Sequence, residues 1–273
     1  MPDPDSPYSR LNYRRLIAWP ARIEREWPFL EKMLAAAPAR TVIDLGCGTG
    51  EHVRHLASRG FRGVGIDQSE EQIVAARDYE GEFGEHGPEF LLGSIAELPQ
   101  LTEERFGAAL CLGNVVPHLE DSEMARALAA LAGRMLPRGR VVLQLINYER
   151  VFAKNIRAMP INLRQDPQRP DGEIAFVRLM TPDGDRHVRF YPLTLALRPD
   201  EDPPVELKAA REVRLRAWNR DDLTAALERS GFKIESVCGD MVGGAYEAEN
   251  SADLVVVATR AGAARPAADN LAK

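Results

Sequence analysis

Residues 41–50, TVIDLGCGTG, constrain the fold of this chain more than any other segment. Their first half is mostly apolar, as in a strand that is covered on both faces, and such strands are typical of parallel sheets. Gly46, Gly48 and Gly50 follow directly. Glycine permits a tight turn and removes the Cβ atom that would hold a ligand away from the backbone. The segment therefore predicts a buried strand that runs into a ligand-binding turn.

A second apolar run, residues 61–67, ends in Asp67. A carboxylate about 20 residues beyond a glycine turn can accept hydrogen bonds from both hydroxyls of a ribose. The glycines fall as G-x-G-x-G, and Glu51 and His52 stand where the nicotinamide fingerprint G-x-G-x-x-G has its last residues. This spacing favours a nucleoside-bearing cofactor other than a nicotinamide dinucleotide. An ordinary strand-to-helix turn without a ligand is the alternative.

Strands and helices alternate from residue 41 to residue 147, which is the pattern of a doubly wound α/β sheet. We expect strands over residues 41–45, 61–67, 89–92, 106–112, 141–146, 232–237 and 254–258. Helices are expected over residues 8–37, with a break at Pro20, and over residues 51–58, 69–79, 121–136 and 219–231. Three stretches of alternating polarity between residues 173 and 217 indicate an antiparallel β insert.

The chain is expected to divide into parts with different roles. These are N-terminal helices that cover the cofactor site (residues 1–37), an α/β core (38–150), an antiparallel insert or lid (151–217), a C-terminal helix with the last two core strands (218–260), and a tail (261–273). The tail is rich in alanine, and we expect it to be disordered.

Composition narrows the class of protein. The formal net charge is -6, with both signs scattered along the chain, whereas a non-specific nucleic-acid binder needs a basic stripe. No apolar run is long enough to span a bilayer, and the N-terminus lacks the apolar core of a signal peptide. The three cysteines have neither zinc spacing nor an obvious disulfide pattern. We therefore expect a cytoplasmic protein with no metal site and no membrane or nucleic-acid partner.

The segment DLGCGTG, which begins at Asp44, resembles motif I of the class I S-adenosylmethionine (SAM) methyltransferases. Residues 111–121, CLGNVVPHLED, are similar to the segment CLGNSFAHLPD of the glycine and sarcosine N-methyltransferases. Residues 147–149, NYE, stand where that family has NYD, and Arg22 precedes Asp44 by the same separation as the family's carboxylate-binding arginine. The resemblance covers residues 22–150 and fades in the insert. It implies a Rossmann-like methyltransferase fold with a seven-stranded, mostly parallel sheet.

The resemblance also implies a set of residues around SAM. Arg22 is expected to pair with the SAM carboxylate, Asp67 with the ribose hydroxyls, and the Leu112 carbonyl with the amine. Ser94 and Ile95 are expected to flank the adenine, although the family has Asn rather than Ser at the former position. The full cofactor-binding set is Arg22, Asp44, Gly46, Gly48, Gly50, Asp67, Gln68, Ser94, Ile95, Leu112 and His118.

Several of these residues also have simpler interpretations. His118 can cap the following helix, and Arg22 can lie on a solvated helix face. Asn147 and Tyr148 can merely close a strand. The family's N-terminal arm has no clear counterpart, although Tyr8, Tyr13 and Trp19 are candidates for part of its role, and Tyr246 is a candidate lid residue. The insert arginines are expected to be mostly solvated, with one free to hold an acceptor carboxylate: Arg178, Arg186, Arg189, Arg214 and Arg216.

The expected chemistry is methyl transfer from SAM to a small molecule. This reaction is an in-line displacement for which the protein mainly supplies alignment and excludes water. An amine acceptor can lose its proton to solvent, so no dedicated base is needed. Asn114, at the expected carboxyl edge of the sheet, is the candidate acceptor contact. O-methylation, with His118 as the base, is the alternative.

Other functions fit less well. DNA amino-methyltransferases have an Asn/Asp/Ser-Pro-Pro-aromatic motif after the fourth strand, and residues 114–117 do not match it. A nicotinamide oxidoreductase and a non-catalytic SAM-binding protein remain alternatives. The insert suggests a lid or a homodimer contact.

Overall fold

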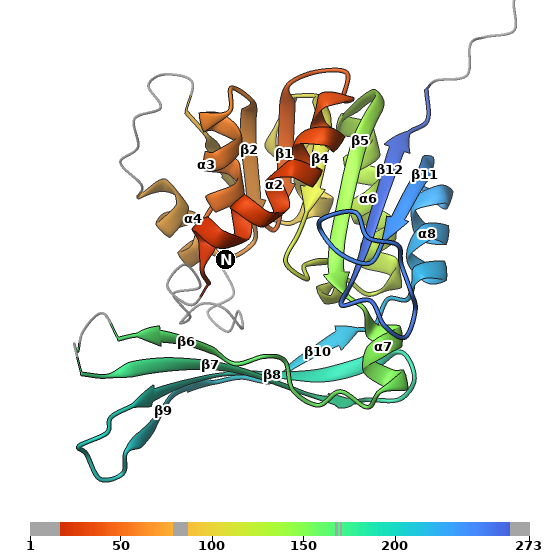
Figure 1. Cartoon of the computed structure of the whole chain (residues 1–273). Coiled ribbons are helices and arrows are strands. Elements are labelled where there is room, and N and C mark those ends of the chain that lie inside the picture. The colour runs from red at the N-terminus through yellow and green to blue at the C-terminus, as the bar shows by residue number, and fades with distance from the viewer. Residues whose placement is uncertain (1–16, 79–86, 167–168, 170, 263–273) are drawn as a thin grey trace, which may run out of the picture.

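The computed structural model describes residues 17–78, 87–166, 169 and 171–262. The chain forms a large mixed sheet covered by helices and a separate antiparallel sheet that lies across the ends of its strands (Figure 1). No helix in the described ranges is long and apolar enough to cross a membrane. Tyr8 and Tyr13 lie outside the described residues, as do residues 263–273 of the expected tail.

The large sheet has seven strands in the order β11-β12-β5-β4-β1-β2-β3. The strands β1, β2, β3, β4 and β5 pair in parallel, whereas β12 is antiparallel to both neighbours. This confirms the expected doubly wound, mostly parallel fold. The strand bounds are β1 Thr41–Leu45, β2 Arg62–Asp67, β3 Glu89–Leu92, β4 Phe106–Cys111, β5 Met135–Ile146, β11 Phe232–Cys238 and β12 Asp253–Arg260.

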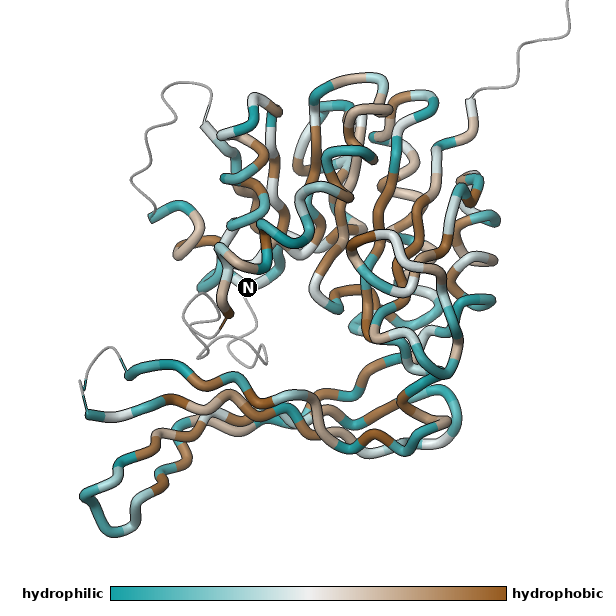
Figure 2. The backbone as a smooth tube through the Cα atoms, viewed as in Figure 1, coloured by the Kyte–Doolittle hydropathy of each residue, from teal (hydrophilic) through white to brown (hydrophobic). Residues whose placement is uncertain are grey.

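Alternation along the strands sends neighbouring side chains into two different cores. Ile43 belongs to a core that includes residues of α6 (Asp121–Arg134) and α8 (Arg220–Arg229), whereas Val42 belongs to one that includes residues of α2 (Trp19–Ala35) and α3 (Glu51–Ser58). Figure 2 shows hydrophobic residues concentrated along these strands. The strand order reverses between β1 and β4, and such a reversal opens a crevice at the carboxyl ends of the strands. The helices are α2 Trp19–Ala35, α3 Glu51–Ser58, α4 Glu70–Arg77, α5 Leu98–Leu101, α6 Asp121–Arg134, α7 Tyr148–Ala153 and α8 Arg220–Arg229, with 3-10 turns η2 Ile95–Glu97 and η3 Val116–His118.

One local expectation needs correction, and another is tested only in part. Pro20 lies in the first turn of α2, where a proline forfeits no intrahelical hydrogen bond, and the expected helix on its N-terminal side falls mostly outside the described residues. The helix α6 ends at Arg134 rather than at residue 136, and β5 follows without a loop. Met135 pairs with Phe106 of β4. The pairing register between β4 and β5 then shifts, so that the next pair is Ala108 with Arg140. Pairing with β4 therefore begins the strand earlier than the local sequence suggests.

The insert folds as an antiparallel sheet in the order β10-β8-β7-β6, with β9 also paired to β8. It lies across the end of the large sheet to which β5 points (Figure 1). The expected antiparallel strands between residues 173 and 217 are confirmed, with the third stretch divided into β9 and β10, whereas β6 and α7 were not predicted. The bounds are β6 Asn162–Gln165, β7 Glu173–Pro182, β8 His187–Leu197, β9 Val205–Ala210 and β10 Val213–Arg216.

Candidate functional site

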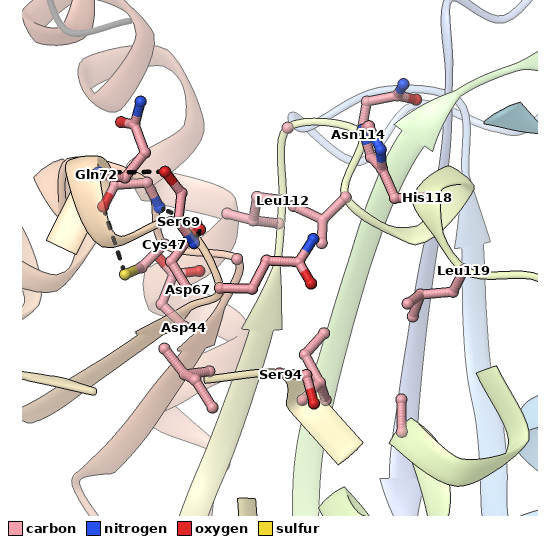
Figure 3. Close-up of a pocket in the computed structure, with 18 of the residues that line it drawn as sticks. Asp44, Cys47, Asp67, Ser69, Gln72, Ser94, Leu112, Asn114, His118 and Leu119 are labelled. Atoms are coloured by element: carbon pink, nitrogen blue, oxygen red, sulfur yellow. Dashed lines mark hydrogen bonds between the residues drawn. The ribbon is translucent and has the colours of Figure 1, made fainter. Parts of the chain in front are cut away.

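A pocket of about 290 Å³ opens at the carboxyl ends of β1, β2 and β4. Figure 3 shows Asp67 and Ser69 at one side of it and Asn114 and His118 at the other. Its wall contains every residue of the expected site except Gly50, namely Arg22, Asp44, Gly46, Gly48, Asp67, Gln68, Ser94, Ile95, Leu112, Asn114 and His118. The fold thus brings together residues that are far apart in the sequence.

The three glycines of the turn after β1 have different roles. All three have left-handed φ values. A Cβ atom would meet Val115 at 2.6 Å if built on Gly46 and Phe90 at 2.4 Å if built on Gly50. At Gly48 the same atom would meet only Gln72 Oε1, at 3.9 Å. Gly46 and Gly50 are therefore needed for packing, whereas Gly48 leaves open space in the pocket for a ligand.

Asp67 is fixed by the backbone around it. The amide nitrogen of Gly48 donates to Oδ2 and that of Ser69 donates to Oδ1, each at 2.9 Å. Burial raises the pKa of Asp67, although these backbone hydrogen bonds oppose the rise. Each carboxylate oxygen has a further lone pair, so the group can still accept from a ligand hydroxyl.

Asp44 is the most deeply buried acid of the pocket wall, with 3% of its surface exposed. Burial raises its pKa to about 6, even though His52 and Arg22 place positive charge nearby. A ligand that brings a cationic group to this position would favour the ionised carboxylate, because an opposite charge lowers an acid's pKa.

Arg22 reaches the pocket from α2. Its Nη2 and Nη1 atoms lie 3.6 and 3.7 Å from the place where a Cβ atom on Gly113 would stand. Its Nε atom donates to Glu26 at 2.9 Å, so this arginine does not lie on a simply solvated helix face. The far wall holds Ser94, whose amide nitrogen donates to the Glu97 carboxylate at 2.8 Å at the start of η2.

The carboxamide of Asn114 joins the ends of β4 and β5. Its Oδ1 accepts from the amide nitrogen of Ile146 at 3.0 Å, and its Nδ2 donates to the Tyr148 hydroxyl at 3.1 Å. Asn114 also has a left-handed φ of 70°. The Tyr148 hydroxyl also lies 3.4 Å from Oδ1. These contacts hold the Asn114 side chain in place, and one Nδ2 hydrogen is left to meet an acceptor.

His118 ends η3 at the opposite side of the pocket from Asp67. Burial lowers its pKa to about 4. The imidazole is therefore neutral at physiological pH and is a weak base.

Several residues weighed in the sequence lie away from the pocket. The Tyr246 hydroxyl lies 2.5 Å from the Glu149 carboxylate and 3.0 Å from Asn147 Oδ1, and Asn147 in turn caps α7. The insert arginines bond acids or backbone carbonyls, and none of them lines the pocket. Arg216 corrects the expectation of solvated charges, since only 1% of its side chain is exposed and it pairs with Asp222 at 2.6 Å.

Part of the wall was missed by sequence reasoning. Ser69 and Gln72 belong to the first turn of α4 and its cap, and Glu123, Arg126 and Ala127 belong to α6. Their spacings of three and four place each group on one helix face, which is the signal that could have identified them. No cluster of three or more potential metal ligands occurs among the residues that the structure describes.

Comparisons with known proteins give a consistent result. A family model for a methyltransferase domain matches residues 42–139. A glycine/sarcosine N-methyltransferase of Aphanothece halophytica is 29% identical over 189 residues, which cover 65% of this chain and 70% of that protein. A glycine/sarcosine N-methyltransferase of Parasynechococcus marenigrum (strain WH8102) is 30% identical over 192 residues, 66% and 67% of the two chains.

Solved structures share the fold. A SAM-bound amino pentose methyltransferase from Micromonospora echinaspora has a TM-score of 0.67 at 22% identity, covering 91% of this chain and 94% of that one. A sugar N-methyltransferase from a Streptoalloteichus species has a TM-score of 0.65 at 20% identity, covering 92% of each chain.

Proposed function

The chain belongs to the class I SAM-dependent methyltransferases, and we propose that its acceptor is a small amine whose nitrogen receives the methyl group. Its similarity to the glycine/sarcosine N-methyltransferases makes glycine and sarcosine the first acceptors to test. Amino sugars are the second class, because structures named for such acceptors share the fold.

The cofactor pocket suits SAM in its shape and its charges. The open space at Gly48 admits the ligand against the backbone, and the fixed carboxylate of Asp67 accepts the ribose hydroxyls. The Arg22 guanidinium takes the carboxylate of the methionine part, and the Leu112 carbonyl takes its amine. Ser94 and Ile95 flank the adenine. Bound SAM supplies a methyl group that is already activated by a positively charged sulfur.

Similarity to the glycine/sarcosine N-methyltransferases is the observation that carries the choice of nitrogen, and the properties of His118 support it. Attack by an alcohol needs a base to remove its proton, and an imidazole with a pKa of about 4 is poorly suited to that task. The other imidazole of the pocket, His52, is bonded to Glu26 at 3.0 Å. An amine can lose its proton to solvent before it binds, so these residues need only orient the acceptor and exclude water.

Asn114 is the proposed acceptor contact. Its carboxamide is held by Ile146 and Tyr148, so its remaining hydrogen-bonding capacity points in a fixed direction. The insert sheet is the proposed cover of the acceptor side, because it lies across the end of the large sheet to which β5 points. A homodimer through this insert and a cytoplasmic location remain predictions.

Matched acceptors test the proposal. Glycine and glycolate differ only in an amine and a hydroxyl, so the enzyme should form S-adenosylhomocysteine with glycine or sarcosine and not with glycolate. Mass spectrometry detects the methylated product. The rate with an amine should rise with pH as the acceptor loses its proton. Turnover of hydroxyl acceptors and not of their amine partners would show that the alternative, O-methylation, is correct.

A further inference from the structure

A buried carboxylate stands directly behind Arg22. Glu26 lies one helical turn further along α2, and its Oε1 accepts from Arg22 Nε at 2.9 Å. Its other oxygen, Oε2, lies 3.0 Å from His52 Nε2, which comes from α3. Glu26 does not line the pocket, whereas Arg22 and His52 both do. The side-chain contacts of Glu26 with the pocket wall therefore run through these two residues.

The environment of Glu26 keeps it charged and fixed. Only 3% of the residue is exposed. Burial alone would raise the pKa of Glu26, but the His52 hydrogen bond and the positive charge of Arg22 hold it below its usual value. Arg25 adds a more distant contact of 3.7 Å from the solvent side, where 66% of its own side chain is exposed. The two close donors thus hold the two oxygens from different helices.

This arrangement determines which part of Arg22 can meet a ligand. Its Nε is occupied by Glu26, and the Trp19 ring lies 5.0 Å from its guanidinium carbon. The Nη1 and Nη2 atoms remain on the side of Gly113, which lines the pocket. A guanidinium held in this way presents two donors together, the geometry that suits a carboxylate.

We propose that Glu26, backed by His52, is a positioning residue that aims Arg22 at the carboxylate of the bound cofactor. The inference rests on the proposed role of Arg22 in SAM binding. Without Glu26, the long arginine side chain would sample several rotamers, and part of the binding free energy would be lost in ordering it.

A merely structural ion pair between α2 and α3 is the competing explanation, and two ligands separate it from the proposal. SAM and decarboxylated SAM differ only in the carboxylate. Arg22→Ala should weaken SAM binding by roughly 10–100-fold, as expected for the loss of a charge-assisted pair. The same variant should bind decarboxylated SAM with almost unchanged affinity. Glu26→Gln should show the same selectivity with a smaller loss, and it should add almost nothing in the Arg22→Ala background.

The matched control is Glu24→Gln, the same chemical change at an exposed position of the same helix, which should leave both affinities unchanged. His52→Gln keeps Glu26 in place and provides a second variant if Glu26→Gln does not fold. His52→Gln should also weaken the binding of SAM more than the binding of decarboxylated SAM. Calorimetric titration of the full chain measures all of these affinities.

The outcomes are distinguishable. Equal losses for both ligands in Glu26→Gln and His52→Gln, with a selective loss in Arg22→Ala, would overturn the positioning role and leave the role of Arg22 intact. A loss in Arg22→Ala that does not depend on the carboxylate would overturn both. Selective losses in all three variants, with no further loss in the double variant, are the expected result.

Discussion

The amide nitrogen of Gly48 donates to Oδ2 of Asp67 at 2.9 Å, which ties the glycine turn after β1 to the end of β2. Asp67 also accepts from Ser69, the residue that caps α4. The acid expected to bind a ribose is therefore also a structural link between two strands and a helix. Its position is set before any ligand arrives.

Asp67→Ala should impair both stability and cofactor binding. It removes the charged acceptor of the part-buried amide groups of Gly48 and Ser69, which should lower the free energy of unfolding by about 1–3 kcal/mol. Urea denaturation measures this loss, and calorimetric titration with S-adenosylhomocysteine measures the loss of affinity. An unchanged affinity in the folded variant would contradict the proposed ribose contact.

Alanine substitutions in the glycine turn should separate binding from packing. Gly48→Ala places its methyl group in the open part of the pocket, so it should sharply weaken S-adenosylhomocysteine binding while costing only about 1–2 kcal/mol of backbone strain. Gly46→Ala should cost more stability, because its methyl group meets Val115 at 2.6 Å. Gly133→Ala in α6, where nothing lies within 4 Å, is the control and should be neutral or stabilising. Equal stability of the Gly46 and Gly48 variants would show that the packing argument is wrong.

Asp44 should make the protein less stable as pH rises. Burial raises its pKa from 3.8 to about 6, so the folded state binds the proton more tightly than the unfolded state. The protonated Asp44 therefore contributes up to about 3 kcal/mol to the free energy of unfolding. This contribution is present below pH 4 and is lost as pH rises through about 6. Asp44→Asn mimics the protonated form and should gain stability over the wild type between pH 4 and 7 in urea titrations. The exposed Asp185→Asn is the control. A pH-independent difference between wild type and Asp44→Asn would contradict the buried carboxylate as the cause.

His118 should make the protein less stable as pH falls, the opposite of the effect of Asp44. Burial lowers its pKa from 6.5 to about 4, so the folded state favours the neutral ring, and this contribution is lost as pH falls from 6.5 through 4. His118→Gln should remove this acid sensitivity, up to about 3 kcal/mol. The slopes from Asp44 and His118 partly cancel in the wild type, so denaturation of both single variants is needed to resolve them. An unchanged slope in His118→Gln would show that its ring titrates normally.

Local patterns predicted the glycine turn, Asp67 and the strand β1, because a motif of adjacent residues fixes them. The resemblance placed Arg22 at the pocket, although α2 itself gives no local sign of it. Pairing between distant segments was invisible: β5 begins at Met135 because that residue pairs with Phe106. The burial of Arg216 was missed for the same reason, since its partners Asp121 and Asp222 lie on different helices.

The point at which the insert joins the large sheet has a further consequence. The chain leaves the sheet after β5, builds β6 to β10, and returns through α8 to complete the sheet with β11 and β12. The residues of the pocket wall all come before the insert in the sequence. Lengthening or replacing the insert would leave β1, β2 and β4 as they are. With the proposed roles of the insert and the pocket, one cofactor-binding frame could be fitted with different acceptor covers, and a change of acceptor need not disturb the residues proposed to hold the methyl donor.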